Sequence, residues 1–147
     1  MSNFSTHLRY LAILLLATAL TGIAAGFFGW NETDDRWSSN ILFWLVMFVL
    51  SVTQAKRIPP STIQFTGSFL LFFLIASIAT IAGLALWDSP DYVLGILFVQ
   101  VNWIGYYPGG DAWFPIAIAI WGISAYALSL TAFLAGSSLR IWTSQDY

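Results

Sequence analysis

The chain has 147 residues, of which 59% are hydrophobic and 8% charged, with a net charge of −2 and a mean hydropathy of +0.77. A soluble domain carries about 25% charged residues, so this chain has too little charge to cover a water-facing surface. It contains no cysteine and one histidine, His7, which excludes disulfides, iron–sulfur clusters, thiolate metal sites and a bis-histidine haem within one chain. We therefore expect an integral membrane protein with no nucleic-acid partner and no metal site.

The first apolar run covers residues 8–28 and is long enough to cross a membrane as a helix. Its basic start resembles that of a signal peptide, but the run is long for one and lacks an A-x-A cleavage site. The second run, residues 37–54, is shorter and at about 1.5 Å per residue reaches about 27 Å, which just crosses the hydrocarbon. Asp34 or Asp35 is placed to cap its N-terminus.

The third run covers residues 63–87, a length that spans the membrane with some tilt. The segment KRIPPS before it turns the chain, and its prolines suit the first turn of the following helix. The fourth run covers residues 112–139, with Asp111 as the expected N-cap and Pro115 in the first turn, where a missing N–H costs little. These runs predict an all-α bundle of four transmembrane helices that forms a single membrane domain over residues 1–147.

The basic residues predict the orientation of the four spans, because Lys and Arg accumulate in cytoplasmic loops. With the N-terminus in the cytoplasm, Arg36 is the only basic residue outside, and those inside are Arg9, Lys56, Arg57 and Arg140. The acidic residues follow the opposite pattern, and only Asp146 lies inside. We expect a plasma (inner) membrane protein with both termini cytoplasmic.

One apolar segment, residues 92–107, belongs to none of the four spans. It is short for a transmembrane helix and carries Gln100 and Asn102. A fifth span here would move Arg140 outside and Asp111 inside, against the charge rule. The pattern favours a re-entrant or interfacial segment on the outer face, with a fifth span as the alternative.

An aromatic and acidic surface is predicted on the outer face, around the segment YYPGGDAWFP at residues 106–115. An interfacial aromatic belt explains most of these rings, residues 108–110 supply a turn, and Asp111 caps the last helix. Unpaired amides in an apolar segment are costly, so Gln100 and Asn102 need backbone, water, a ligand or a partner chain. The candidate ligand or partner surface comprises Gln100, Asn102, Trp103, Tyr106, Tyr107, Asp111 and Trp113.

Two stripes of small residues predict where helices pack closely. In the first span Thr18, Gly22 and Gly26 recur every four residues and include a G-x-x-x-G motif. In the fourth span spacings of three and four alternate, as in a heptad seam, through Gly122, Ala125, Ser129, Ala132 and Gly136. Packing inside the chain's own bundle is the favoured interpretation, and docking onto a second polypeptide is the alternative.

The spans contain no charged residue near their centres, although proton relays, ion-coupled transport and voltage sensing usually require one. A Ser-His-Asp arrangement is disfavoured because His7 precedes the first span and the acidic cluster lies across the membrane. We expect the uncharged hydroxyls to bond their own helix or a neighbouring one. They are Thr18, Thr21, Ser51, Thr66, Ser68, Ser77, Thr80, Ser124, Ser129 and Thr131.

The sequence therefore favours a non-catalytic small membrane subunit that packs against other chains and stabilises or positions them. Its expected partners are membrane lipid and either other membrane subunits or further copies of itself. The alternative is a protein that binds a lipid or a lipophilic small molecule, or an oligomeric pore, through the outer aromatic and acidic face. The sequence does not identify a cofactor, and an enzyme is the third and least favoured class.

Overall fold

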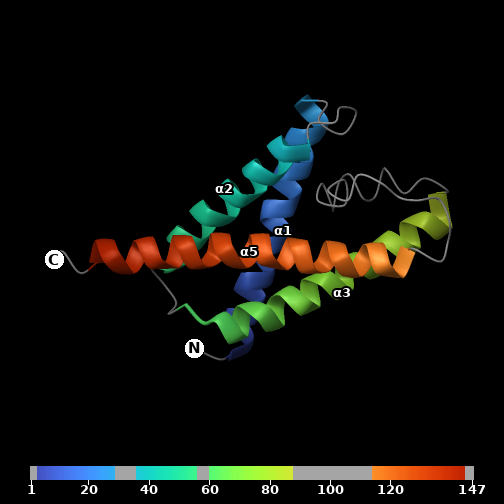
Figure 1. Cartoon of the computed structure of the whole chain (residues 1–147). Coiled ribbons are helices and arrows are strands. Elements are labelled where there is room, and N and C mark those ends of the chain that lie inside the picture. The colour runs from blue at the N-terminus through green and yellow to red at the C-terminus, as the bar shows by residue number, and fades with distance from the viewer. Residues whose placement is uncertain (1–2, 29–35, 56–59, 88–113, 145–147) are drawn as a thin grey trace.

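The computed structural model describes residues 3–28, 36–55, 60–87 and 114–144. These residues form four α-helices, coloured from blue to red in Figure 1: α1 (Asn3–Phe28), α2 (Arg36–Ala55), α3 (Thr62–Trp87) and α5 (Phe114–Ser144). The predicted re-entrant or interfacial segment, residues 92–107, lies outside the described residues, as do the expected caps Asp34, Asp35 and Asp111.

Each predicted span corresponds to one helix, but α1 and α5, the first and last helices along the chain, extend beyond their apolar runs. Helix α1 begins at Asn3 and α5 ends at Ser144, beyond the predicted limits of 8 and 139. The apolar run marks only the part of a helix that suits hydrocarbon, whereas the backbone can continue its hydrogen bonds through polar residues such as Ser5 and Thr6.

Two of the described helices contain a stretch that is long and apolar enough to cross a membrane. These stretches are Phe4–Ala24 in α1 and Gly122–Leu139 in α5. The apolar stretches of the other two helices are shorter, at Asn40–Gln54 and Thr62–Ile78. These two stretches are distinguished by length and composition alone. A signal sequence or the core helix of a soluble protein can have the same length and composition.

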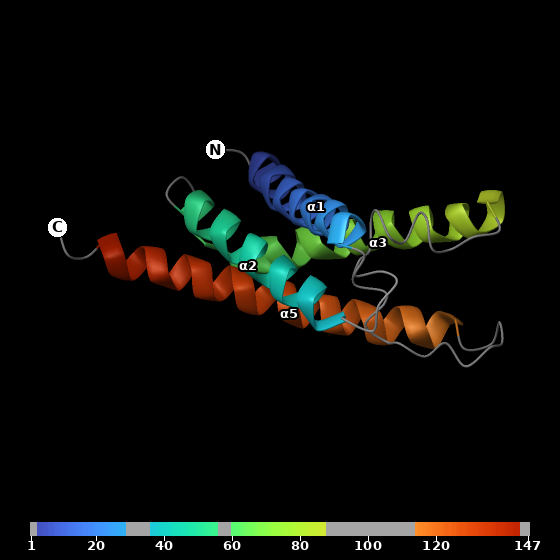
Figure 2. The same cartoon turned by 90° about the horizontal axis from the view of Figure 1, so that it is seen from above.

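The described helices pack in a ring in the order α1, α2, α5, α3, so that each lies against two neighbours. The contact between α2 and α5 is the most extensive, and that between α3 and α5 is the smallest of the four. Figures 1 and 2 show that α1 and α2 extend together to one side of the shared core, whereas α3 and α5 extend together to another. The four helices are therefore tightly packed only where the two pairs cross.

Aromatic rings fill the core where α1, α3 and α5 meet. Tyr10 packs edge-on against Phe65 and Phe133 with ring centroids 5.8 Å and 5.4 Å away, and Phe65 stacks on Phe133 at 4.4 Å. Such pairs contribute about 0.5–1.5 kcal/mol each beyond the burial of their area. The buried core also includes Ile13, Leu14, Ala17, Phe43, Met47, Phe69, Phe72, Ala125 and Ala132.

The outward faces of α1, α2 and α3 carry stripes of large apolar side chains. Spacings of three or four residues keep each stripe on one side of its helix. Phe27 at the end of α1 is 83% exposed. The exposed stripes are Leu16, Leu20, Ile23 and Phe27 on α1, Ile41, Leu45 and Val49 on α2, and Leu70, Leu74 and Ile78 on α3.

Ser61 fixes the start of α3. Its carbonyl oxygen accepts the Phe65 N–H at 2.9 Å, and its Oγ accepts the Gln64 N–H at 3.4 Å, which makes it the N-cap. Pro60 therefore lies outside the helix, and the prediction that it belongs to the first turn was wrong, because the hydroxyl of the next residue supplies the cap. The corresponding prediction for Pro115 is confirmed, since α5 begins at Phe114.

We predict that Ser61→Ala lowers the free energy of unfolding by about 0.5–1 kcal/mol, because the Gln64 N–H loses its acceptor. Ser61→Asp is the matched control, since a carboxylate oxygen can accept the same hydrogen bond and should retain the stability. Thermal unfolding in detergent, followed by circular dichroism, measures both variants. Equal losses for Ala and Asp would show that the side chain of Ser61 is not a cap.

Candidate functional site

The candidate ligand or partner surface of the outer face lies entirely outside the described residues. This applies to Gln100, Asn102, Trp103, Tyr106, Tyr107, Asp111 and Trp113. The second group of candidates, the two small-residue stripes, lies on α1 and α5 and is placed by the structure.

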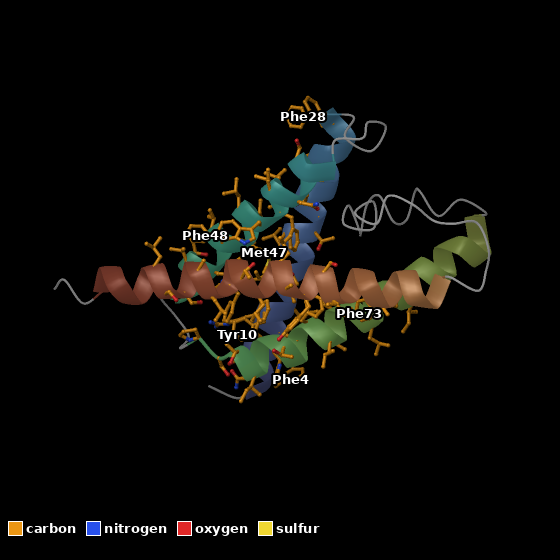
Figure 3. The ribbon with its side chains drawn as sticks, in the orientation of Figure 1. Phe4, Tyr10, Phe28, Met47, Phe48 and Phe73 are labelled. Atoms are coloured by element: carbon orange, nitrogen blue, oxygen red, sulfur yellow. The ribbon has the colours of Figure 1, made fainter. Side chains whose placement is uncertain are left out.

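The small-residue stripe of α5 is buried along its whole length, from Gly122 to Gly136. A methyl group added to Gly136 would lie 2.6 Å from the carbonyl oxygen of Phe48 and 2.9 Å from Cβ of Ser51, so the α5 backbone rests directly on α2. A methyl group at Gly122 would lie 2.7 Å from the ring of Phe73 on α3. Phe48 and Phe73 lie on opposite sides of α5 in Figure 3. Both ends of the stripe are thus covered by helices of the same chain.

The stripe of α1 also faces the interior at the positions that the structure describes. Thr18 and Gly22 are buried, and the Thr18 hydroxyl donates to the Leu14 carbonyl at 2.8 Å. The side-chain environment of Gly26 lies outside the description. Helix α1 packs against α2 and α3, so this face serves the bundle of the chain itself.

Three hydrogen bonds between described side chains join neighbouring helices, and they share one chemical pattern. In each, a Ser or Thr hydroxyl meets the polar tip of an aromatic side chain from the next helix. The pairs are His7 Nδ1 with Ser68 Oγ at 3.0 Å, Tyr126 OH with Thr66 Oγ1 at 2.7 Å, and Trp44 Nε1 with Thr131 Oγ1 at 3.2 Å. We call them the interhelical ties, and they connect α1 with α3, α5 with α3, and α2 with α5.

The direction of each tie follows from the second hydrogen bond of the hydroxyl. Ser68 donates to the Gln64 carbonyl at 2.8 Å, Thr66 to Thr62 at 2.8 Å, and Thr131 to Leu128 at 2.9 Å. A hydroxyl has one hydrogen and two lone pairs, so an oxygen that donates within its own helix can only accept from the neighbour. Trp44 is the donor in its tie, and Ser68 and Thr66 accept from His7 and Tyr126 where their hydrogens point to the carbonyls of their own helix.

This direction decides what the His7–Ser68 pair can do. A serine nucleophile must give its proton to the histidine, but the Ser68 hydrogen faces the carbonyl oxygens of Gln64 at 2.8 Å and His7 at 3.3 Å. With the Ser68 hydrogen on a carbonyl oxygen, the pair is a packing contact between α1 and α3. Within the described ranges, no group of three or more His, Cys, Asp or Glu side chains could hold a metal ion.

The expectation that His7 precedes the first apolar helix was wrong. It lies inside α1, in the stretch Phe4–Ala24, and is half-buried. The ring packs onto α3 at Gly67, where an added methyl group would lie 3.3 Å from its Cε1 atom. The absence of a side chain at residue 67 leaves room for the imidazole beside Ser68.

The expectation for the hydroxyls is confirmed at most of the positions that the structure describes, but their aromatic partners were not predicted. Trp44 and Tyr126 each follow a buried residue, Phe43 and Ala125. A Trp or Tyr within an apolar helix needs a partner for its polar hydrogen when it is buried. This requirement could have predicted that Trp44 and Tyr126 form hydrogen bonds, although it does not identify the helix that supplies the acceptor.

Known proteins offer no relative for this chain, because no family model, no curated protein and no solved structure matches it. Its function is therefore inferred from the physical properties of the helices. Those properties are an apolar outer surface, a close helix contact at Gly136, and the interhelical ties.

We predict that Gly136→Ala destabilises the fold and that Gly122→Ala does so far less. The new methyl at residue 136 meets backbone and a short side chain of α2, which cannot move without separating the helices. We expect a loss of about 1–3 kcal/mol in the free energy of unfolding. At residue 122 the obstacle is the end of the flexible Phe73 side chain, and alanine favours the helix by up to about 1 kcal/mol.

Denaturant titration in detergent compares the two glycine variants directly, because they are the same substitution in the same helix. Equal losses would contradict a direct backbone contact at Gly136. A near-neutral Gly136→Ala variant would show that α2 and α5 lie farther apart than the structure places them.

We predict that Tyr126→Phe lowers the free energy of unfolding by only about 0.6 kcal/mol, the average for a hydrogen bond between helices in lipid. The Thr66 hydroxyl keeps its bond to the Thr62 carbonyl, and the ring keeps its contact with Phe69 at 5.1 Å. Removal of the ring in Tyr126→Ala serves as the comparison and should cost several times more. A Phe variant as unstable as the Ala variant would mean that Thr66 depends on Tyr126.

Proposed function

We propose that the chain is a four-span integral membrane protein that serves as a non-catalytic subunit of a larger membrane assembly. The apolar stripes on α1, α2 and α3 are the main support, because they cover the outside of a bundle whose core is already formed. Exposing such area to water costs about 25 cal/mol per Å², whereas hydrocarbon solvates it at no cost. Ile63 and Phe27, at 84% and 83% exposed, are typical of this surface.

The proposed topology places both termini in the cytoplasm of a cell with this protein in its plasma (inner) membrane. The distribution of basic residues supports it, with Arg9, Lys56, Arg57 and Arg140 on the cytoplasmic side. Residues 92–107 then form the re-entrant or interfacial segment of the outer face, and the interfacial aromatics form a belt there.

A subunit role is favoured over transport or catalysis by what the described polar groups do. The hydroxyls of Ser68, Thr66 and Thr131 accept the interhelical ties and bond their own helices. These three hydroxyls thus use their hydrogen bonds to pack the helices of the bundle together. The remaining outward faces then contact lipid or other chains.

The proposed partner surface has two parts. The first is the outer-face set of Gln100, Asn102, Trp103, Tyr106, Tyr107, Asp111 and Trp113, which mixes rings, amides and a carboxylate. Aromatic residues are enriched where protein partners meet, and the amides need hydrogen-bond partners that lipid does not supply. The second part is the set of apolar stripes, along which a further transmembrane helix or another copy of the chain can pack.

Native mass spectrometry of the chain, extracted from its source membrane into lipid nanodiscs, tests the subunit proposal. We expect a stoichiometric complex with other polypeptides or with further copies of the chain. The triple substitution Tyr106→Ala, Tyr107→Ala and Trp113→Ala should release the partner, while the matched variant Ile123→Ala, at an exposed position of α5 outside the apolar stripes, should not. A particle that retains a non-protein mass and no partner chain would overturn the proposal and favour the lipid or small-molecule binder.

The topology is testable by single-cysteine labelling, because the chain contains no cysteine of its own. We expect a membrane-impermeant maleimide, added from outside intact cells, to label Ser89→Cys and to leave Ser2→Cys and Gln145→Cys unlabelled. Both terminal variants should react once the cells are opened. Labelling of Gln145→Cys from outside would demonstrate a fifth span.

A further inference from the structure

One face of α3 changes its surroundings along the helix. Near the start of α3, Ser68 contacts His7 of α1, with 3.0 Å between Oγ and Nδ1. Leu71 and Ile75 follow at spacings of three and four residues, so they lie on the same face as Ser68. These two apolar side chains are nevertheless 46% and 43% exposed. The face that packs on α1 near the start of α3 is therefore exposed two turns later.

The divergence of the helices explains this exposure. Helices α1 and α2 extend to one side of the core, while α3 and α5 continue together to another (Figures 1 and 2). Helix α5 covers a different face of α3, where the Phe73 ring lies 2.7 Å from the position of a methyl group on Gly122. Leu71 and Ile75 thus belong to the face that α1 leaves. We call this pair the inner face of α3, which is distinct from its outward stripe of Leu70, Leu74 and Ile78.

The chain itself contains a segment that needs such a face. Between Trp87, where α3 ends, and Phe114, where α5 begins, lies the apolar segment 92–107. A segment that enters hydrocarbon and turns back is tolerated only where protein covers its irregular backbone. This segment also lacks the polar face of a helix that lies on a membrane surface, and lipid tails cannot satisfy the amides of Gln100 and Asn102. It therefore requires a protein surface within reach of Trp87.

The segment has the length that the inner face requires. From Leu71 to Trp87, α3 advances about 24 Å at about 1.5 Å per residue. Residues 92–107 cover about the same distance as a helix, and residues 88–91 are enough for the short loop of a helical hairpin. A segment that leaves Trp87 and runs back along α3 therefore ends beside Leu71.

The return from this position to α5 is also within reach. Helix α5 passes α3 where Gly122 meets Phe73. Phe114 lies about 12 Å from Gly122 along α5, toward the end of the bundle where α3 terminates at Trp87 (Figure 1). Residues 108–113 span about 20 Å when extended, which is sufficient to connect a segment beside α3 with the start of α5.

We propose that residues 92–107 dock on the inner face of α3, formed by Leu71 and Ile75, on the side that α1 leaves. The inference rests on the proposed topology, which places this segment at the outer face, and adds the surface that covers it. Two features favour the segment over other occupants. The inner face continues the contact between α1 and α3, and the segment is tethered to the end of the same helix.

Disulfide cross-linking in lipid nanodiscs tests the proposal, because the chain has no cysteine of its own. Ile75→Cys is combined with one cysteine at a time in the segment, at four consecutive positions that cover a full helical turn opposite Ile75. These are Val101→Cys, Asn102→Cys, Trp103→Cys and Ile104→Cys. We expect at least one pair to form a disulfide within the chain under mild oxidation, because a disulfide requires Cβ atoms about 4 Å apart.

Leu74→Cys is the matched control, since it lies at the same depth of α3 but on the outward stripe. We expect the best pair with Ile75→Cys to give about tenfold more cross-linked chain than the same segment position gives with Leu74→Cys. Leu71→Cys repeats the test one turn nearer the start of α3 and serves where a variant of Ile75 fails to fold. Its partners in the segment are Gly105→Cys, Tyr106→Cys and Tyr107→Cys.

Three results would overturn the proposal. The absence of a disulfide from both inner-face positions would mean that lipid covers this face. Equal yields from Ile75→Cys and Leu74→Cys would mean that the segment does not select the inner face. A disulfide that joins two chains, seen as a dimer on a non-reducing gel, would assign the face to a second copy.

The cross-link reports the neighbour of the segment and nothing else. Labelling of Gln145→Cys reports the topology, and native mass spectrometry reports the partner chain. A missing disulfide in a protein with a cytoplasmic C-terminus and a bound partner therefore overturns the docking alone. An externally labelled Gln145→Cys or a particle without a partner contradicts the proposed function instead, whether or not the disulfide forms.

Discussion

The direct contact between the backbones of α5 and α2 at Gly136 sets the geometry of the whole bundle. Because no side chain separates the two helices there, Trp44 of α2 can reach Thr131 one turn away. The same placement turns another face of α5 toward α3, so that Gly122 meets Phe73 and Phe133 meets Phe65. Helix α5 thus contacts α2 at Gly136 and adds Phe133 to the aromatic core that it shares with α1 and α3.

The ties between the helices solve a problem that apolar surroundings impose. Apolar side chains offer no partner for the N–H of Trp44 or the hydroxyl hydrogen of Tyr126, so each needs an acceptor elsewhere in the protein. A Ser or Thr that already bonds its own helix supplies that acceptor without creating a new unpaired group. A modest energy per bond is then sufficient, because the bonds fix how the helices are aligned while ring and backbone packing supply most of the attraction.

The four helices of the described residues and their approximate limits were predictable, because each needs an apolar run of sufficient length. Their ends were less so, since Asn3 and Ser144 lie in polar turns that a helical backbone can still include. The spacing of the α5 stripe predicted which face packs closely. It did not predict that α2 covers Gly136 and α3 covers Gly122, because periodicity identifies a face and not its partner. His7 was misplaced because its anchor, Ser68, is 61 residues away along the chain. The outer-face surface lies outside the described residues and stays a prediction.

The ring order of the helices has a consequence for synthesis on the ribosome. Helices α1 and α2 emerge first and pair with each other, and α3 then packs against α1. The face of α2 that carries Ser51 acquires its cover only when Gly136 has been translated, on the order of ten seconds later at ordinary elongation rates. During this interval the face of α2 that carries Ser51 is open. Premature termination before α5 would make that exposure permanent and mark the truncated product for degradation.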